Sequence, residues 1–346
     1  MDSRKVQRIG LKTLAVTLPK HWVKSVGLKP GDIIVFTVQP DNSLLLRTNS
    51  MLQKRIEHVE TIYSDLCNEP NLLERVLIGS YILGVDTVKI ISSGRIRASC
   101  IETIRSITHK LMGIGIIQES SNEIILQCSI DPTKFPIHLL IRRLYIIVST
   151  MHRDAMDALR ELDIDLAKEV LTREYEANVV YWLTLRLLKL VQEKRDLMYE
   201  IGIQSPFQIL TLWSITQYLE RIGDWIKNIA ELIVTLKLQK IVADKREIEE
   251  VLKLGEKAYD ICYLAMQSLY RRDIKLANSL IDEYKDNFEK ERIKFSIGDS
   301  GCILDRINFA IRRVAELGAE IAEMIIDCSI EFPNEICEIT EEERSC

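Results

Sequence analysis

The sequence predicts a multidomain, mainly α protein with three parts: a module of short strands at the N-terminus, a small α+β segment, and two tandem three-helix bundles. The chain has 346 residues, more than the roughly 100–200 residues of one domain. Only 6% of the residues are aromatic, and 14 Gly and 8 Pro are few for a long β protein. From Pro132 onward, apolar residues recur with the 3.6-residue period of a helix.

Residues 1–50 have the pattern of two hairpins around one short helix. Pro19 is well placed at the first position of that helix, and Gly27 can end it. Turn residues separate the expected strands, which are Lys5–Ile9, Thr13–Thr17, Ile33–Val38 and Ser43–Arg47, the last two around Pro40-Asp41-Asn42. Because fifty residues cannot close much of a core alone, we expect a homodimer that shares strands through residues 1–50.

The charge of the chain is divided unevenly. A net charge of −5 argues against a nucleic-acid-binding protein, but residues 1–50 contain eight basic and three acidic side chains, a local charge of +5. A dimer would double this charge on one face, which suits DNA phosphates. The alternative is a solubilising face on a dimerisation module. The candidate DNA-binding residues are Arg4, Lys5, Arg8, Lys12, Lys20 and Lys24.

Residues 51–131 form the α+β segment. We expect helices at about 53–66, 72–83 and 97–110, and strands at 87–91, 115–119 and 123–129. The segment contains no phosphate-binding loop and no catalytic constellation, and the sequence assigns it no role.

The helical region contains an internal duplication. Residues 155–167 align without gaps with 265–277 at an offset of 110, and 220–231 align with 312–323 at an offset of 92. Two copies of a three-helix unit therefore follow each other. The six expected helices are 136–162, 164–194, 206–237, 245–272, 274–297 and 303–331. The expected division of the chain is 1–50, 51–131, 132–240, 241–333 and an acidic tail at 334–346.

A polar stripe runs along the third helix of the first copy. Glu220 and Asp224 lie one turn apart and Asn228 follows, a spacing at which carboxylates repel each other by a few tenths of a kcal/mol. A hard cation would convert this repulsion into binding. The alternative is a solvated face whose charge is relieved by Arg221 and Lys227.

Acidic residues recur at related places in both copies. The candidate ligands outside the stripe are Glu174 on the middle helix of the first copy, Asp282 and Asp286 on that of the second, and Glu316 and Glu320 on the last helix. Arg312 stands where the first copy has Glu220, and a cation there would oppose a metal ion. Metal binding is therefore better supported in the first copy.

No other chemistry is indicated. None of the five His follows a Glu at the Glu-x-x-His spacing of di-iron bundles, and the eight Cys form no Cys-x-x-Cys pair. We therefore expect a protein that is not an enzyme. The first residues contain no apolar signal region and no stretch approaches 18 apolar residues, so we expect a soluble, cytoplasmic protein without membrane insertion.

The N-terminal segment resembles the AbrB/SpoVT family. The matching residues, 5–36, contain KVQRIG, the Leu-Pro-Lys helix start and the Gly-Leu-x-x-Gly-Asp turn, and the resemblance covers about 1–48. It implies a swapped-hairpin β-barrel formed by two intertwined chains, and DNA binding.

The helical region resembles the PhoU family over about 133–331. The segment ERIGDWIKNIAE at 220–231 carries the acidic motif of that family. The resemblance implies metal ions on the acidic motifs, either iron or zinc, with magnesium as a further candidate. It also implies negative control of phosphate uptake, and a phosphate transporter ATPase or a sensor as partner. The fusion of the two families resembles archaeal proteins.

Three functions fit these observations. The first is a DNA-binding regulator of phosphate homeostasis whose bundle senses a metal or a partner. The second is a signalling adaptor that dimerises through residues 1–50 without binding DNA and regulates a transporter or sensor. The third is a metal-binding or storage protein.

Overall fold

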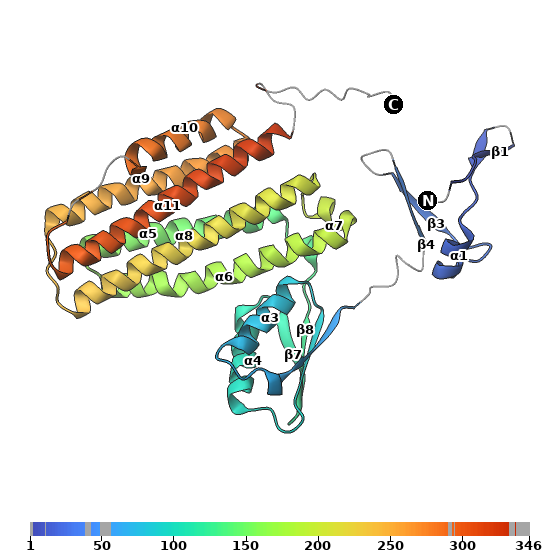
Figure 1. Ribbon diagram of the computed structural model, residues 1–346, viewed down its shortest axis with the longest axis horizontal. Helices are drawn as coiled ribbons and strands as arrows, with labels where there is room; N and C mark the ends of the chain where they lie inside the picture. The colour runs from blue at the N-terminus through green and yellow to red at the C-terminus, as the bar shows by residue number, and fades with distance from the viewer. Residues whose placement is uncertain are drawn as a thin grey trace. The chain divides into compact units, whose positions relative to one another are not determined.

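The computed structural model describes residues 3–10, 12–38, 43–48, 57–289, 293, 295–331 and 336. It divides the chain into two compact units, Met1–Glu57 and His58–Cys346. Figure 1 shows a small strand-containing unit and a larger unit made of a sheet with two helices and a bundle of long helices. The expected acidic tail at 334–346 lies outside the described residues except for residue 336.

The first unit follows the predicted order of strands and helix. β1 (Gln7–Ile9) pairs with β2 (Thr13–Ala15), α1 (Lys20–Val26) follows, and β3 (Ile34–Val38) pairs with β4 (Leu44–Thr48). Both pairs are antiparallel. Pro19 precedes α1 as its N-cap instead of occupying its first turn, and Gly27 ends it with a φ of 66°. The predicted turn at 40–42 lies outside the described residues.

This unit has almost no core of its own. Among its described residues only Thr48 is buried. Large apolar side chains are exposed on both hairpins, including Phe36 at 61% and Val38 at 67%. Others are Val6, Ile9, Leu14, Val16, Ile33 and Leu44. Strands of this kind need a further surface to cover them.

The second unit begins with a four-stranded sheet. Its order is β5-β6-β8-β7, with β5 (Val59–Tyr63) parallel to β6 (Thr87–Ile91) and the other pairs antiparallel. β7 spans Ile114–Glu119 and β8 spans Glu123–Cys128. Figure 1 shows α3 (Leu72–Ile82) and α4 (Ala98–Lys110) lying together on one side of this sheet. Their shared core includes Ile90, Ile104, Ile107, Ile124 and Leu126.

The predicted helix at 53–66 is wrong. Residues 59–63 form β5, and a single 3-10 turn follows at Ser64–Leu66. The β-branched residues Val59, Thr61 and Ile62 favour an extended chain, and parallel pairing with β6 satisfies the backbone. Residues 51–56 lie outside the described part of the chain.

The bundle contains six long elements in two sets of three. The first set is α5 (Ile137–Glu161), α6 (Ile164–Glu193) and α8 (Pro206–Leu238); the second is α9 (Lys245–Arg271), α10 (Ile274–Tyr284) and α11 (Asp299–Ile330). Side chains of Asp163, Ser205, Asp244 and Asp273 cap four of the helix N-termini. Both sets contribute to one continuous apolar core.

Three details of the bundle differ from the prediction. The fifth helix does not continue to residue 297, because regular α-helix ends at Tyr284 and a π-helical turn, Lys285–Glu289, follows. The guanidinium of Arg312 donates to the carbonyl oxygen of Phe288 in that turn. A short helix, α7 (Arg195–Glu200), lies where a loop was expected, and α11 begins at Asp299 instead of residue 303.

The two copies are arranged antiparallel to each other. The middle of α5 meets the first half of α9, where His152 Nε2 lies 2.9 Å from the carbonyl oxygen of Gly255. α11 approaches α9 closely at Gly318, where a Cβ atom would lie 2.9 Å from Cys262 Sγ.

Among the residues that the structure describes, no helix is long and apolar enough to cross a bilayer.

Candidate DNA interface and carboxylate cluster

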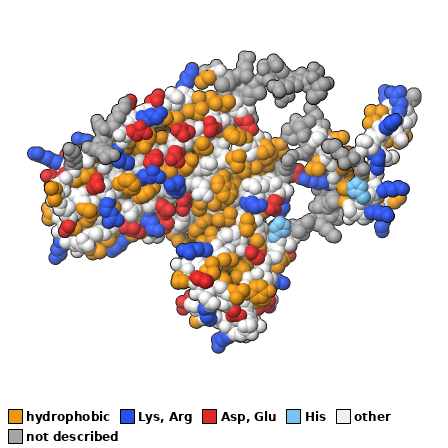
Figure 2. Space-filling model, viewed as in Figure 1, with side chains coloured by type: hydrophobic (Ala, Val, Ile, Leu, Met, Phe, Trp, Pro, Cys, Tyr) orange, Lys and Arg blue, Asp and Glu red, His pale blue; other side chains and the backbone are white. Residues whose placement is uncertain are grey.

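All six predicted DNA-binding side chains are exposed. Lys20 and Lys24 lie one turn apart on α1, so they share a face of that helix. Arg8 lies on β1 opposite Leu14, and Lys12 lies in the turn that joins β1 to β2. Arg4 and Lys5 precede β1. Figure 2 shows basic side chains on the surface of this unit. The unit therefore presents cations on both its first hairpin and its helix.

Three carboxylates meet between α6 and α8. Glu174 of α6 lies close enough to Glu220 and Asp224 of α8 to affect the pKa of both. Burial, then Asp224, then Glu174 raise the pKa of Glu220 to about 7. Burial and then Glu174 raise the pKa of Asp224. Glu174 and Glu220 are half-buried and Asp224 is exposed. These three side chains, named here the carboxylate cluster, repel one another, and their repulsion favours a bound proton or cation.

Two neutral or positive groups contact the carboxylate cluster. Lys227 Nζ lies 3.3 Å from Glu174 Oε1, and the amide of Asn178 donates to the same oxygen at 2.7 Å. Burial, followed by Glu220, raises the pKa of the neighbouring Tyr181 to about 12. Asn228, the third residue of the predicted stripe, is half-buried one turn beyond Asp224.

The carboxylate oxygens of the cluster are the type of ligand that a hard cation prefers. Within the described residues, however, no three His, Cys, Asp or Glu side chains are arranged as a set that could hold a metal ion. As the cluster stands, Lys227 supplies the positive charge beside Glu174.

The second copy replaces this cluster with a different set of side chains. With the offsets of the repeat, Arg312, Glu316 and Tyr284 occupy the positions of Glu220, Asp224 and Glu174. Arg313 Nη1 lies 2.5 Å from Glu316 Oε2, and burial followed by Glu316 raises the pKa of Tyr284. One carboxylate beside two guanidinium groups is a poor cation site.

The remaining acidic candidates of the second copy are placed apart from this set. Asp282 and Asp286 are exposed, on α10 and on the π-helical turn, and the amide of Asn278 lies 3.5 Å from Asp282. Glu320 lies against Tyr218 of α8, where burial and then Glu320 raise the pKa of that phenol.

Comparison with protein-family models gives two matches. Residues 141–233, which comprise most of the first bundle copy and its carboxylate cluster, match the PhoU domain model. The chain carries a PhoU domain. Residues 7–53 match the model described as "Antidote-toxin recognition MazE, bacterial antitoxin". A PhoU domain preceded by a MazE/AbrB-type domain is therefore confirmed.

Comparison with solved structures finds a crystal structure of PhoU from Pseudomonas aeruginosa. It is 18% identical, covers 55% of this chain and 93% of its own chain, and has a TM-score of 0.48. No curated protein matches the sequence. Both matched families are regulatory, and the PhoU match covers the first copy of the bundle but not the second.

Proposed function

We propose that this protein is a homodimeric, cytoplasmic DNA-binding regulator of phosphate homeostasis. The MazE/AbrB-type domain would hold DNA, and the PhoU domain would sense a metal ion or a protein partner. The two family matches support this assignment together. The observation that carries it is the set of six exposed basic side chains on a unit whose sequence matches the MazE model.

The exposed apolar strands of the first unit support the dimer. A unit that buries only Thr48 among its described residues gains little from the hydrophobic effect as a single chain. A second copy would cover Phe36, Val38 and Leu44, each more than half exposed, with its own hairpins. The two chains together would carry about twice the basic charge of one.

DNA binding is tested by the salt dependence of affinity in the full-length protein. Each phosphate contact contributes a slope of about −0.9 to a plot of log affinity against log salt. The double variant Arg8→Ala/Lys12→Ala is expected to flatten this slope by about 2. Lys237→Ala/Lys253→Ala removes the same charge from exposed positions of the bundle and is expected to leave the slope unchanged. Equal slopes in all three proteins would refute the interface.

The carboxylate cluster is the candidate sensor of a divalent or trivalent metal ion, such as iron, zinc or magnesium. Mutual repulsion among Glu174, Glu220 and Asp224 supports this role, because a cation would relieve it. Elemental analysis and thermal unfolding with added metal test it. Glu220→Gln/Asp224→Asn is expected to abolish metal-induced stabilisation while helicity is kept. Wild-type protein that gains no stability from any of the three metals would refute it.

A second candidate is a signalling adaptor that binds a phosphate transporter ATPase, a sensor or a toxin-like partner. The observation that favours it is the match of residues 7–53 to the MazE antitoxin family, whose name refers to recognition of a toxin. A pull-down that recovers the same partner with wild-type protein and with Arg8→Ala/Lys12→Ala, together with no DNA binding by either, would decide for it.

A further inference from the structure

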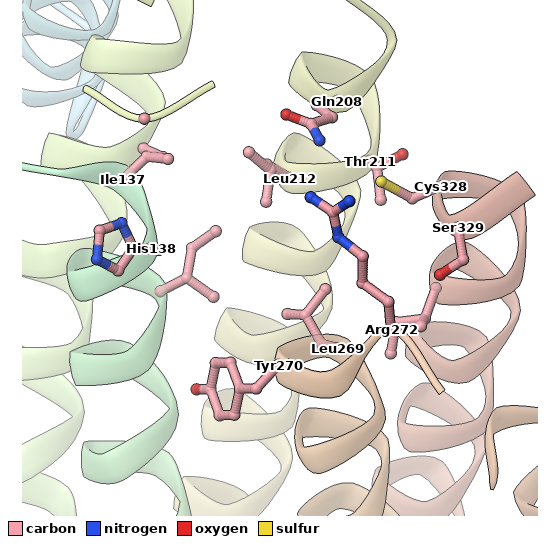
Figure 3. Close-up of a pocket in the computed structure, with 13 residues that line it drawn as sticks. Ile137, His138, Gln208, Thr211, Leu212, Leu269, Tyr270, Arg272, Cys328 and Ser329 are labelled. Carbon is pink, nitrogen blue, oxygen red and sulfur yellow. The ribbon is translucent and has the colours of Figure 1, made fainter. Parts of the chain in front are cut away.

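A cavity lies at one end of the bundle, where the two copies meet. It has a volume of about 330 Å³, in the range of sites for small ligands. Its walls come from the start of α5, the start of α8, the end of α9 and the end of α11. Figure 3 shows Arg272 extending from the end of α9 into the space between Leu212 and Cys328. Any molecule held there would contact both copies of the repeat.

The duplication provides an internal control for this cavity. The same helices meet again at the opposite end of the bundle with the copies exchanged. The offsets of 110 and 92 match His138, Arg272 and Cys328 with Ile248, Leu162 and Leu236. Thr211 and Leu269 likewise match Ile303 and Leu159. Ile248, Leu159, Leu236 and Ile303 are buried and Leu162 is half-buried. Four other lining residues, Ile137, Gln208, Tyr270 and Ser329, match the polar residues Glu247, Ser300, Arg160 and Lys237.

At four of these positions, therefore, the opposite end has aliphatic side chains where the cavity has His138, Arg272, Cys328 and Thr211. The cavity is open to solvent, and both His138 and Arg272 are exposed at its mouth. A hollow of this size with an apolar wall and a few polar groups has the make-up of a small-ligand site.

The lining specifies the chemistry of that ligand. Arg272 and His138 are the two residues of the lining that carry or can carry positive charge, and no Asp or Glu is among the lining residues that the structure describes. This contrasts with the net charge of −5 of the whole chain. Hydroxyl and amide groups come from Thr211, Tyr270, Ser329 and Gln208. The apolar wall is formed by Ile137, Ile141, Leu212, Leu269 and Ile325.

Arg272 is held in an unusual backbone conformation at this site. Its φ of 54° is in the left-handed region, which non-glycine residues seldom adopt, and the matched residue Leu162 has a φ of 48°. Both copies of the repeat therefore share this backbone conformation, whereas only the second copy has a guanidinium at this position. Arg272 Nη2 donates to Gln204 Oε1 at 3.2 Å, which anchors the planar group at the cavity. A guanidinium has five N–H donors and binds carboxylates in a bidentate manner.

We propose that this cavity binds a small carboxylic acid with an apolar body. The carboxylate would pair with Arg272 beside Gln208 and Thr211, and the apolar body would lie against Ile141, Leu212 and Ile325. Binding would join the end of α9 and α11 in the second copy to the start of α5 and α8 in the first. The inference concerns the bundle alone and does not depend on DNA binding.

Calorimetric titration of the full-length protein with octanoate tests the proposal. Octanol has the same apolar body without the charge, and inorganic phosphate has charge without the body. Octanoate is expected to bind at least about tenfold more tightly than either, a difference of about 1.4 kcal/mol. Arg272→Gln is expected to weaken octanoate binding about tenfold or more, and the adjacent exposed Arg271→Gln is expected to leave it unchanged.

A second variant tests the contribution of the hollow space independently of the charge of Arg272. Leu212→Trp fills the hollow and is expected to abolish octanoate binding while the helical circular dichroism is retained. The proposal is overturned if wild-type protein does not bind octanoate at about 10 mM, a very weak affinity. It is also overturned if octanol or phosphate binds equally well, or if Arg271→Gln and Arg272→Gln have equal effects. An intact fold in these variants is checked by thermal unfolding.

Discussion

The guanidinium of Arg186, in the last third of the bundle helix α6, donates to the carbonyl oxygen of Tyr81 at 2.6 Å and to that of Val85 at 3.1 Å. It also lies over the Tyr81 ring, 4.9 Å from its centroid. Tyr81 is in the last turn of α3, where carbonyl groups lack helical partners. A cation at the C-terminus of a helix also interacts favourably with the negative end of the helix dipole. Arg186 therefore fastens the α+β segment to the PhoU domain.

Replacing Arg186 is expected to destabilise the protein. Only 3% of Arg186 is exposed, so Arg186→Gln leaves buried carbonyl groups without their charged donor, at a cost of about 3 kcal/mol. Urea denaturation measures the loss, and faster hydrogen exchange from Leu83 to Val85 would locate it. Arg105→Gln is the control, because Arg105 is 63% exposed and its ion pair with Glu119 is worth less than about 1 kcal/mol. Equal losses in both variants would contradict the role of Arg186.

His152 predicts a loss of stability in mild acid. Burial lowers its pKa from 6.5 to about 4 in the folded protein. Between these values the unfolded chain binds the proton and the folded chain does not, so the free energy of unfolding falls as pH decreases from about 6.5 to about 4. The contribution is about 3 kcal/mol.

His152→Gln removes this titration and keeps a donor near Gly255. The difference in unfolding free energy between wild type and variant should change across pH 4 to 6.5, which the titration range of His152 defines. The exposed His109→Asn should show no such change. A pH-independent difference for His152→Gln would contradict the expectation.

The raised pKa of Glu220 predicts the opposite dependence of stability on pH. This pKa is raised from 4.5 to about 7, so the folded protein holds a proton that the unfolded chain has lost, and stability falls as pH rises through this interval. Glu220→Gln is expected to be more stable than wild type at a pH of about 8, by about 1–2 kcal/mol after allowance for solvent screening. Thermal denaturation in chelator measures this gain. Glu231→Gln, exposed on the same helix, should give no gain, and a destabilised Glu220→Gln would contradict the cluster's repulsion.

The exposed strands predict that association stabilises the first unit. Phe36→Asp places a charge on β3, where the wild-type ring is 61% exposed, and is expected to shift sedimentation from dimer to monomer. The helical circular dichroism of the bundle should be retained. Leu238→Asp is the control, since Leu238 is 69% exposed at the end of α8. A wild-type protein that sediments as a monomer at about micromolar concentration would refute the dimer.

Helical periodicity located the long bundle helices because each buries one apolar face against a common core. Helical periodicity gave the wrong prediction for residues 59–63. This segment has polar neighbours, but its β-branched residues form β5, which pairs with β6. Helical periodicity also extended the fifth helix beyond Tyr284. Local helix propensity in residues 285–297 did not reveal the π-helical turn or the contact from Arg312, which is 24 residues further along the chain.

The candidate sites differ in how far the sequence revealed them. Glu220 and Asp224 were recognisable as an i, i+4 pair, but the partial burial of Glu220 and its raised pKa depend on packing of α6 against α8. The cavity was missed because its lining residues lie between 137 and 329 on four helices. One signal was present: Arg272, His138 and Cys328 stand where the other copy has the aliphatic residues Leu162, Ile248 and Leu236.

The proposed function of this protein is to regulate phosphate homeostasis by binding DNA. Genome-wide mapping of the DNA bound by the full-length protein in its own cells tests it most directly. We expect discrete bound sites beside phosphate-transport genes, and their loss in Arg8→Ala/Lys12→Ala but not in Lys237→Ala/Lys253→Ala. Absence of bound sites, or sites that persist unchanged in the Arg8→Ala/Lys12→Ala protein, would contradict it.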